Sequence, residues 1–291
     1  MRIAITGANG QLGSALSAAL SPKRTIVPLG HQQLELDSPA VVEQVVASGV
    51  DLVIHAAAMT NVDGCARDPE QAYRINSLGT KYVALACRSM GVPLVYISTN
   101  EVFAGDNERP YYEYDQTGPV NAYGRSKLAG ELVVRELLDR FYIVRVAWLF
   151  GGARNFVRTI LRLAEAPPAG GLRMVDDEVG SPTFCPDVAE AVTRLIATDQ
   201  YGTYHFVNSG SASRDSFART ILRLAGRTEV AVTSIKLADY RRDSVPPPYT
   251  PLANLAGAAL GITLRPWEEA LAAYLVELGA YAPSIERPLS L

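Results

Sequence analysis

Two spacings of hydrophobic residues alternate along the first half of the chain. Short, nearly continuous apolar runs are separated by longer segments in which apolar residues recur every three or four positions. The first pattern is typical of strands buried on both faces of a parallel sheet, and the second of amphipathic helices. We expect strands at Arg2–Thr6, Thr25–Leu29, Leu52–His55, Leu94–Ser98 and Tyr142–Val146, and helices at Gln11–Leu20, Pro39–Ala47, Pro69–Met90 and Tyr123–Leu138. This alternation predicts an α/β fold with a doubly wound parallel sheet and right-handed crossovers.

Past about residue 150 the pattern becomes irregular, and segments rich in proline and glycine interrupt it at Pro167–Gly171 and Val245–Pro251. We expect helices at Phe156–Ala164, Pro186–Ala197, Arg214–Ala225 and Trp267–Leu278, and strands at Leu172–Val175, Tyr204–Val207 and Val230–Ile235. This mixed order predicts a smaller α+β lobe. The expected organisation is a first domain of residues 1–150 and a second lobe of residues 151–291 that closes over it, with the chain crossing between the two.

Composition and charge argue against nucleic acids and membranes as partners of this protein. Of the 291 residues, 48% are hydrophobic, and the formal net charge is -3. This charge argues against a nucleic-acid partner and against a basic membrane-surface helix, and no apolar run reaches the roughly 18 residues of a membrane span. The opening MRIAIT predicts a strand rather than a signal peptide. Cys65, Cys87 and Cys185 follow no disulfide or metal spacing, so we expect reduced thiols, a cytoplasmic location and no metal.

The turn between the first strand and the first helix is rich in glycine. Within Thr6–Gly13, Gly7, Gly10 and Gly13 stand three residues apart. Glycine permits the tight turn, lets a pyrophosphate approach bare backbone and lets the helix pack close to the strand. The helix N-terminus adds free N–H groups and the positive end of its dipole. We therefore predict a Rossmann-type domain that binds a nicotinamide dinucleotide at this turn.

The ends of the second and third strands carry weaker signals. After Leu29 there is no carboxylate to hold a ribose 2′-hydroxyl and repel a 2′-phosphate, so both NADPH and NADH are allowed. Asp37 either reaches the adenine edge or caps the helix expected after it. The small residues Ala56–Ala58 either line a flat ligand or pack closely. For His55 we expect a buried, hydrogen-bonded side chain rather than a catalyst.

Tyr123 and Lys127 carry the main chemical signal. Their spacing at the start of a helix puts the phenol and the ammonium on one face. A nearby cation lowers the pKa of a phenol, so Lys127, together with the charge of the nicotinamide, is expected to lower that of Tyr123. The hydroxyl of Thr99, at the end of the fourth strand, can bond to the same substrate oxygen. Asn76 either kinks the long helix and holds a proton-relay water, or is a tolerated helical residue.

These motifs together resemble the extended short-chain dehydrogenase/reductase family over almost the whole chain, and within it the dTDP-4-dehydrorhamnose reductases. Any one of the motifs is generic, whereas their combination is specific to that branch. The resemblance is carried by TGANGQLG at Thr6–Gly13, HAAAMTNVD at His55–Asp63, STNEVFAG at Ser98–Gly105, PYYEYD at Pro110–Asp115, NAYGRSKLAGE at Asn121–Glu131 and RVAWLF at Arg145–Phe150, followed by Asn155 and Phe156.

The resemblance implies an oxidoreductase of dTDP-rhamnose biosynthesis that reduces the C4 keto group of dTDP-4-dehydro-L-rhamnose to dTDP-L-rhamnose with NADPH or NADH. It implies that Tyr123 donates the proton with help from Thr99, and that Lys127 binds the nicotinamide ribose and tunes Tyr123. The implied cofactor contacts also include Gly7, Asn9, Gly10, Gln11, Leu12, Gly13, Asp37, Ser38, Ala56, Ala57 and Ala58. The implied sugar contacts are Thr60, Thr99, Asn100, Trp148 and Asn155. For Trp148, stacking on a sugar face and packing in the core both stay open.

Two stretches depart from the family's pattern. Asn100 and Glu101 stand where the family usually has Asp and Tyr, and VPPPYTPL at residues 245–252 replaces an Arg-Pro-x-x-Ser-x-Leu segment. The sugar contact implied at Asn100 is therefore made by a changed side chain, and the resemblance carries over no contact for Glu101 or for residues 245–252. Two alternatives are another sugar-nucleotide 4-keto reductase or epimerase, and a non-catalytic cofactor-binding regulatory subunit like that of methionine adenosyltransferase. The retained Thr99, Tyr123 and Lys127 argue against the second. The expected partner is a small nucleotide-sugar substrate, and a homodimer stays open.

Overall fold

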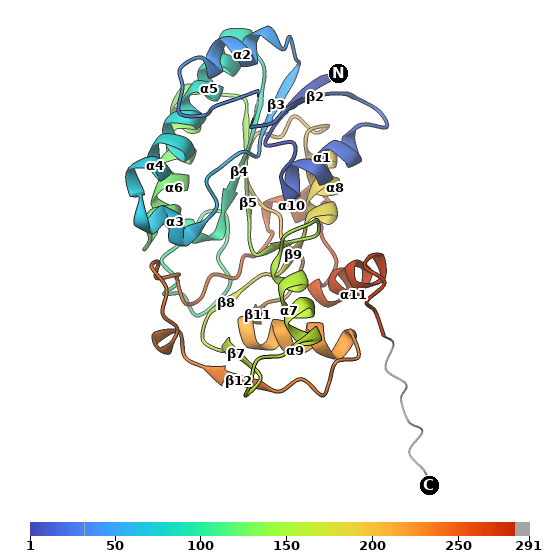
Figure 1. Ribbon diagram of the computed structural model, residues 1–291. Coiled ribbons are helices and arrows are strands. Elements are labelled where there is room, and N and C mark those ends of the chain that lie inside the picture. Colours follow the sequence, from blue (N-terminus) through green and yellow to red (C-terminus); the bar gives the residue numbers. More distant parts are fainter. Residues whose placement is uncertain (32, 283–291) are drawn as a thin grey trace.

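A six-stranded parallel sheet forms the centre of the molecule (Figure 1). The computed structural model describes residues 1–31 and 33–282. The strand order is β10-β5-β4-β3-β1-β2, so β2 and β3 lie on opposite sides of β1. The strands are β1 (Arg2–Thr6), β2 (Thr25–Leu29), β3 (Leu52–His55), β4 (Leu94–Thr99), β5 (Phe141–Val146) and β10 (Gly202–His205). The predicted doubly wound fold is confirmed, and its reversal of strand order puts a ligand crevice beyond the carboxyl ends of β1 and β3.

Helices cover both faces of this sheet (Figure 1). The division is visible in β1, where Ile3 and Ile5 pack in the core beneath α1 and α8, and Ala4 packs beneath α2 and α5. The first face carries α1 (Gln11–Leu20) and α8 (Cys185–Leu195), and α10 (Ala256–Ala259) lies near β10. The second face carries α2 (Val41–Ala47), α3 (Val62–Arg67), α4 (Pro69–Tyr73), α5 (Gly79–Met90) and α6 (Ala122–Leu137).

The helix expected over residues 69–90 is interrupted at Asn76. A π-helical segment, η1 (Arg74–Leu78), separates α4 from α5. The buried amide of Asn76 accepts a hydrogen bond from the Met59 N–H at 2.8 Å and donates to the Met59 carbonyl at 3.0 Å and to the Ser126 hydroxyl at 2.9 Å. The helix is thus interrupted at the position where Asn76 was expected to disturb it, and this side chain ties the loop after β3 to α6. The short α3, which begins after Asn61, was not predicted.

Up to residue 282, the second lobe is built from three helices and three two-stranded sheets. Its helices are α7 (Phe156–Glu165), α9 (Arg214–Leu224) and α11 (Trp267–Glu277). Its sheets pair β12 (Val232–Ile235) with β7 (Leu172–Val175), β11 (Ala212–Ser213) with β8 (Val179–Gly180), and β6 (Leu149–Phe150) with β9 (Thr183–Phe184). Two short 3-10 turns are η2 (Asn100–Val102) and η3 (Leu237–Asp239). Phe150, Phe217 and Trp267 lie in the core of this lobe.

Two segments expected in the second lobe belong to the central sheet instead. The strand expected at Tyr204–Val207 is β10, which pairs with β5 at the edge of the sheet. The helix expected at Pro186–Ala197 is α8, which packs on α1 through Val188 and Val192. The edge strand and the helix beside it return to the sheet after the chain has entered the second lobe, in keeping with the crossing expected between the lobes. Residues 283–291 of the expected lobe lie outside the described residues.

A buried ion pair joins α6 to the sheet. The side chains of Glu131 and Arg145 are 0% and 2% exposed, and two hydrogen bonds of 2.8 and 2.9 Å connect them. The hydroxyl of Ser98, near the end of β4, donates to the same carboxylate at 2.6 Å. Burial opposes ionisation of Glu131, yet the hydrogen bonds from Arg145 and Ser98 hold its pKa below the ordinary value. The pair therefore stays charged and fixes α6 on β4 and β5.

We expect Glu131→Ala to lower the free energy of unfolding by about 3–5 kcal/mol, because it leaves the buried guanidinium of Arg145 without its counter-charge. Urea unfolding followed by circular dichroism measures the loss. Glu70→Ala is the control, since Glu70 pairs with Arg74 on an exposed helix surface and should cost no more than about 1 kcal/mol. Equal, small losses for the two variants would contradict the anchoring role of the buried pair.

Candidate functional site

The glycine-rich turn after β1 leaves the N-terminus of α1 open. Gly7 adopts a φ of +68°, and a Cβ on Gly13 would lie 2.1 Å from the Gly7 carbonyl oxygen. Gly10 begins α1 without a capping side chain, so the first backbone N–H groups of the helix are not claimed by one. A Cβ on Gly7 would also lie 2.8 Å from the backbone of Ala57. The turn thus rests on the end of β3 and fits the cradle that a dinucleotide pyrophosphate needs.

The other expected cofactor residues lie around this turn with different degrees of support. Asn9 is exposed, Leu12 is buried in the core, and Ala56–Ala58 are partly exposed beside the turn. The amide of Gln11 donates to the Leu149 carbonyl at 3.0 Å and so joins α1 to the start of the second lobe. Ser38 is half-buried.

Asp37 is exposed and does not cap a helix. That alternative was wrong, because α2 begins only at Val41 with Ala40 as its N-cap. The expected role of His55 is confirmed: its ring lies between the hydroxyls of Thr6, at 2.6 Å, and Thr80, at 3.2 Å. Burial lowers the pKa of His55 to about 3, and the ring stays neutral at ordinary pH.

Tyr123, Lys127 and Thr99 come together where β4 ends and α6 begins. Asn121 caps α6 by accepting a hydrogen bond from the Gly124 N–H at 2.8 Å, which fixes the first helical turn. Tyr123 is partly exposed on that turn. One turn later the ammonium of Lys127 is buried, with Nζ 4.1 Å from the centroid of the Tyr96 ring. Thr99 is the last residue of β4 and lies within hydrogen-bonding reach of Tyr123.

The protonation of Tyr123 differs from the expectation. Burial, and after it the carboxylate of Glu101, raise the pKa of the phenol, whereas the hydrogen bond with Thr99 lowers it. Lys127 does not bring this pKa down in the protein itself, because burial lowers the pKa of Lys127 to about 7 and only the Glu131 carboxylate opposes that fall. The phenol is therefore protonated at neutral pH, and the ammonium is poised to lose its proton.

The expected sugar contacts occupy different environments. Thr60 is exposed. The buried amide of Asn100 donates to the Thr250 hydroxyl at 2.7 Å. Trp148 is partly exposed with a φ of +40°, and the guanidinium of Arg214 lies 3.5 Å from its ring centroid, so one ring face is already covered. Asn155 caps α7, and its amide donates to the Tyr274 hydroxyl at 2.9 Å. Its described hydrogen bonds are thus structural.

A segment of the second lobe, residues 242–250, crosses the site and was not predicted. The backbone N–H of Ser244 and the guanidinium of Arg242 donate to Asp63 at 3.0 and 3.1 Å. The amide of Asn121 donates to the Val245 carbonyl at 3.3 Å. No local pattern marks these contacts, because their partners are more than a hundred residues apart. The expected departure at Val245–Leu252 is the one signal that pointed to this segment.

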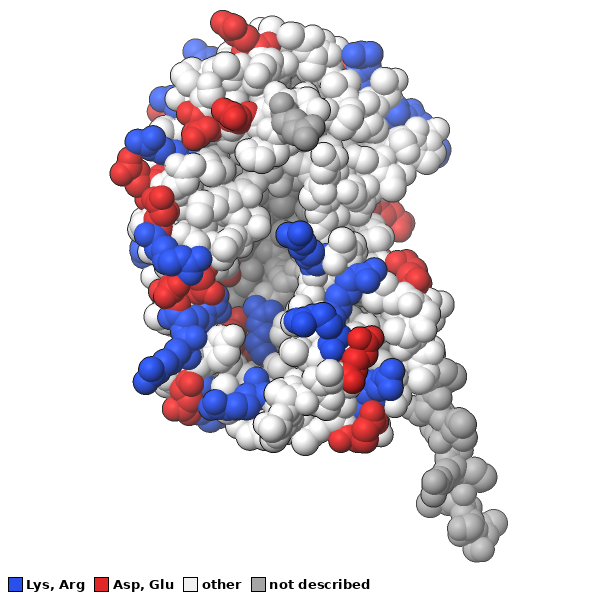
Figure 2. Space-filling view, in the orientation of Figure 1, with Lys and Arg blue, Asp and Glu red and all other residues white. Residues whose placement is uncertain are grey.

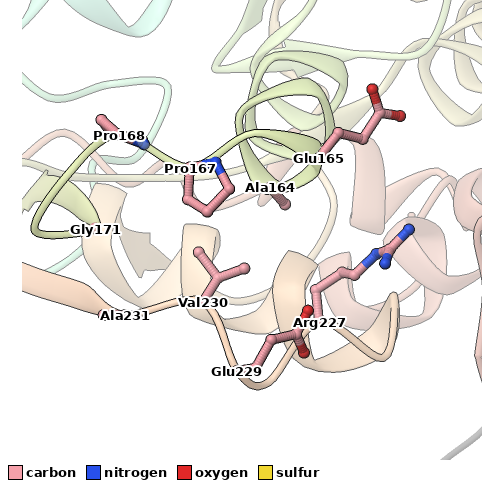
Figure 3. A pocket seen from close by; sticks show the side chains of 9 residues that line it. All are labelled: Ala164, Glu165, Pro167, Pro168, Gly171, Arg227, Glu229, Val230 and Ala231. Atoms are coloured by element: carbon pink, nitrogen blue, oxygen red, sulfur yellow. The ribbon is translucent and has the colours of Figure 1, made fainter.

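Figure 2 shows the molecule hollowed between the lobe that holds the sheet and the second lobe, with Lys and Arg side chains along the rim. The pocket in Figure 3 is a different feature, lined in part by Pro167, Arg227 and Glu229 at the far end of the second lobe. It includes none of the residues expected to bind or react. The candidate site is therefore the place where β4 ends and α6 begins, with Tyr123, Lys127 and Thr99. Within residues 1–31 and 33–282, no helix is long and apolar enough to cross a membrane, and no three metal-binding side chains cluster.

The lowered pKa of Lys127 has a measurable consequence for stability. An unfolded lysine has a pKa of about 10.4, so between pH 7 and that value the unfolded chain binds more protons and the free energy of unfolding rises with pH. We expect the stability of Lys127→Met relative to the unsubstituted protein to fall by roughly 2–3 kcal/mol from pH 7 to pH 9. Urea unfolding without cofactor measures this, with the exposed Lys81→Met as control. A difference that does not change with pH would contradict the burial of a charged ammonium.

The chain is similar to known proteins over nearly its full length. It is 37% identical to a dTDP-4-dehydrorhamnose reductase of Mycobacterium tuberculosis, over 99% of this chain and 96% of that protein. Among solved structures it is similar to a dTDP-4-dehydrorhamnose reductase of Clostridium acetobutylicum, with 38% identity, a TM-score of 0.91 and coverage of 96% and 100% of the two chains. It is also similar to the Bacillus anthracis dTDP-4-dehydrorhamnose reductase in complex with NADP, with 37% identity, a TM-score of 0.90 and coverage of 95% and 99%. Residues 1–279 match the RmlD substrate binding domain, and the chain belongs to that family.

Proposed function

We propose that this protein is an NADPH-dependent oxidoreductase that reduces the C4 keto group of dTDP-4-dehydro-L-rhamnose to give dTDP-L-rhamnose. The observation that carries the proposal is the meeting of Tyr123, Lys127 and Thr99 at the end of β4, beside an open glycine-rich turn. The named relatives, with 37–38% identity over nearly the whole chain, support the same reaction. NADP in the related Bacillus anthracis structure supports the choice of cofactor.

In this proposal the first lobe holds the cofactor, which when bound supplies the hydride for the keto carbon. The free N–H groups at the start of α1 bind the pyrophosphate, and Ala56–Ala58 line the cofactor near the turn. Asp37 and Ser38 meet the adenosine, and Lys127 binds the nicotinamide ribose. Residues 151–291 contribute most of the substrate lobe. The exceptions are β10, which is an edge strand of the central sheet, and α8, which packs beside α1 on that sheet. A cytoplasmic location and a homodimer remain predictions.

Tyr123 delivers the proton that the reduced oxygen needs. The raised pKa of its phenol supports this role, because a donor must be protonated at working pH. The Thr99 hydroxyl bonds to the same substrate oxygen and orients it. The pKa of Lys127, lowered to about 7, allows the ammonium to return a proton toward the phenol. Thr60, Asn100 and Trp148 are the remaining candidates for contact with the sugar.

Tyr123→Phe should lower kcat by about 10²- to 10⁴-fold while NADPH still binds, because only the proton donor is lost. Lys127→Met should weaken NADPH binding as well as turnover. Stereospecific NADPH oxidation with dTDP-4-dehydrorhamnose and NMR of the product measure turnover, and fluorescence titration measures binding. Tightly held NAD with no net cofactor consumption would instead favour an epimerase. Full activity of Tyr123→Phe would remove the proposed proton donor.

The tip of β2 should set the choice between the two cofactors. A Cβ on Gly30 would meet only the ends of the Asn9 and Gln33 side chains, at 2.8 and 2.9 Å, so a side chain can be accommodated. Gly30→Asp should raise the Kd for NADPH by at least about tenfold relative to NADH, since the carboxylate repels the 2′-phosphate. Gly30→Asn, of equal size but uncharged, is the matched control. Equal effects on both cofactors would place the 2′-phosphate elsewhere.

A further inference from the structure

Glu101 lies in the candidate site and has no role in the mechanism above. It belongs to η2, directly after Thr99, whose hydroxyl accepts a hydrogen bond from the Glu101 N–H at 3.2 Å. On the other side, α6 packs so tightly against its backbone that a Cβ on Gly124 would lie 2.1 Å from the Glu101 carbonyl oxygen. The backbone of Glu101 is therefore held between the two elements that carry Thr99 and Tyr123.

One oxygen of the Glu101 carboxylate is bound and the other is free. Oε2 accepts a hydrogen bond of 2.6 Å from the Asn121 amide. For Oε1, no donor is found among residues 1–31 and 33–282, and the atom is not sealed from solvent. The bound oxygen fixes the direction of the carboxylate, so the free oxygen has a defined place in the site.

Among residues 1–31 and 33–282, no lysine or arginine forms an ion pair with this carboxylate. Arg214 and Arg242, both from the second lobe, are close enough to act on its charge. However, Arg214 is paired with Glu178 at 2.9 Å and Arg242 with Asp63 at 3.1 Å. Burial, together with Glu178, raises the pKa of Glu101, whereas the Asn121 amide and the two arginines lower it. The free oxygen of this half-buried carboxylate can therefore accept a hydrogen bond from a ligand that displaces solvent from it.

The place of Glu101 relative to Tyr123 says which part of a ligand it meets. The Glu101 backbone bonds to the Thr99 hydroxyl and its carboxylate bonds to Asn121, the cap of the helix turn that carries Tyr123, so the carboxylate lies beside the groups that would meet the C4 oxygen. A sugar whose C4 oxygen receives the proton of Tyr123 presents C3 and C5 on either side. In a 6-deoxy-4-hexulose C5 carries a methyl group, and C3 carries a hydroxyl.

We propose that Glu101 determines substrate specificity, with Oε1 accepting a hydrogen bond from the C3 hydroxyl of the 4-keto sugar. This inference rests on the proposed function. The bond is charge-assisted and made in a partly enclosed site, so it discriminates against a sugar that lacks this hydroxyl. Glu101 lies in one of the two stretches where the chain departs from its family's pattern. The proposed contact is therefore particular to this chain.

The test compares kcat/KM for dTDP-4-dehydrorhamnose and for its 3-deoxy analogue, in the intact protein with NADPH. Glu101→Ala should lose about 10- to 100-fold on the hydroxylated substrate and little on the analogue. Glu101→Gln, which keeps one acceptor oxygen, should fall between the two. Glu108→Gln is the matched control, because it removes the same charge from an exposed position beyond the same strand. Unchanged NADPH affinity and Tm show that each variant is folded.

Each other outcome overturns the inference. Equal losses on both substrates would mean that Glu101 acts on Tyr123 or on the local fold rather than on the hydroxyl. Equal activity of the variant and the unsubstituted protein on the hydroxylated sugar would mean that no bond is made. If the unsubstituted protein turned over neither sugar although NADPH bound, the proposed function would fail, and this inference with it. The activity of the unsubstituted protein is measured first, so a failure of the proposed function is distinguished from a failure of the inference about Glu101.

Discussion

The carboxylate of Glu131 is the contact on which the arrangement of the site depends. It joins the middle of α6 to Arg145 on β5 and to Ser98 on β4, all of them buried. Glu131, Lys127 and Tyr123 are spaced four residues apart and share one face of the helix. Anchoring the buried end of this row therefore sets the position of the phenol relative to Thr99, the last residue of β4. The chemistry at the surface of the cleft is held by an ion pair in its interior.

A second constraint comes from the hydrogen bonds that cross between the lobes. Asp63, Asn121 and Asn100 each bind the segment of residues 242–250. These three residues come from the first turn of α3, the cap of α6 and the 3-10 turn η2 after β4, close to Thr99 and Tyr123. Asn121 thus both caps α6 and binds the second lobe. Displacing the second lobe would disturb both.

The groups around Tyr123 favour its protonated form. Burial and Glu101 keep the phenol protonated, and the buried Lys127 has its pKa lowered to about 7. His55, which lies beneath the same strand ends, stays neutral between two hydroxyls. The carboxylate of Glu101 is the exception, since in the described part of the chain its arginine neighbours pair with Glu178 and Asp63 instead. Such a group is expected where a ligand completes the hydrogen bonding.

The sequence by itself determined the central sheet, its flanking helices, the glycine-rich turn and the Tyr123–Lys127 pair, because each depends on local spacing: apolar periodicity, glycine geometry and the pitch of a helix. It also marked Asn76, whose polar side chain interrupts an apolar helix face. Only the tertiary structure decided that β10 and α8 join the sheet, that Arg242 and Ser244 bind Asp63, and that burial and Glu101, rather than Lys127, dominate the pKa of Tyr123. These outcomes depend on desolvation and on contacts between residues far apart in the chain, and neither leaves a periodic signal in the order of amino acids.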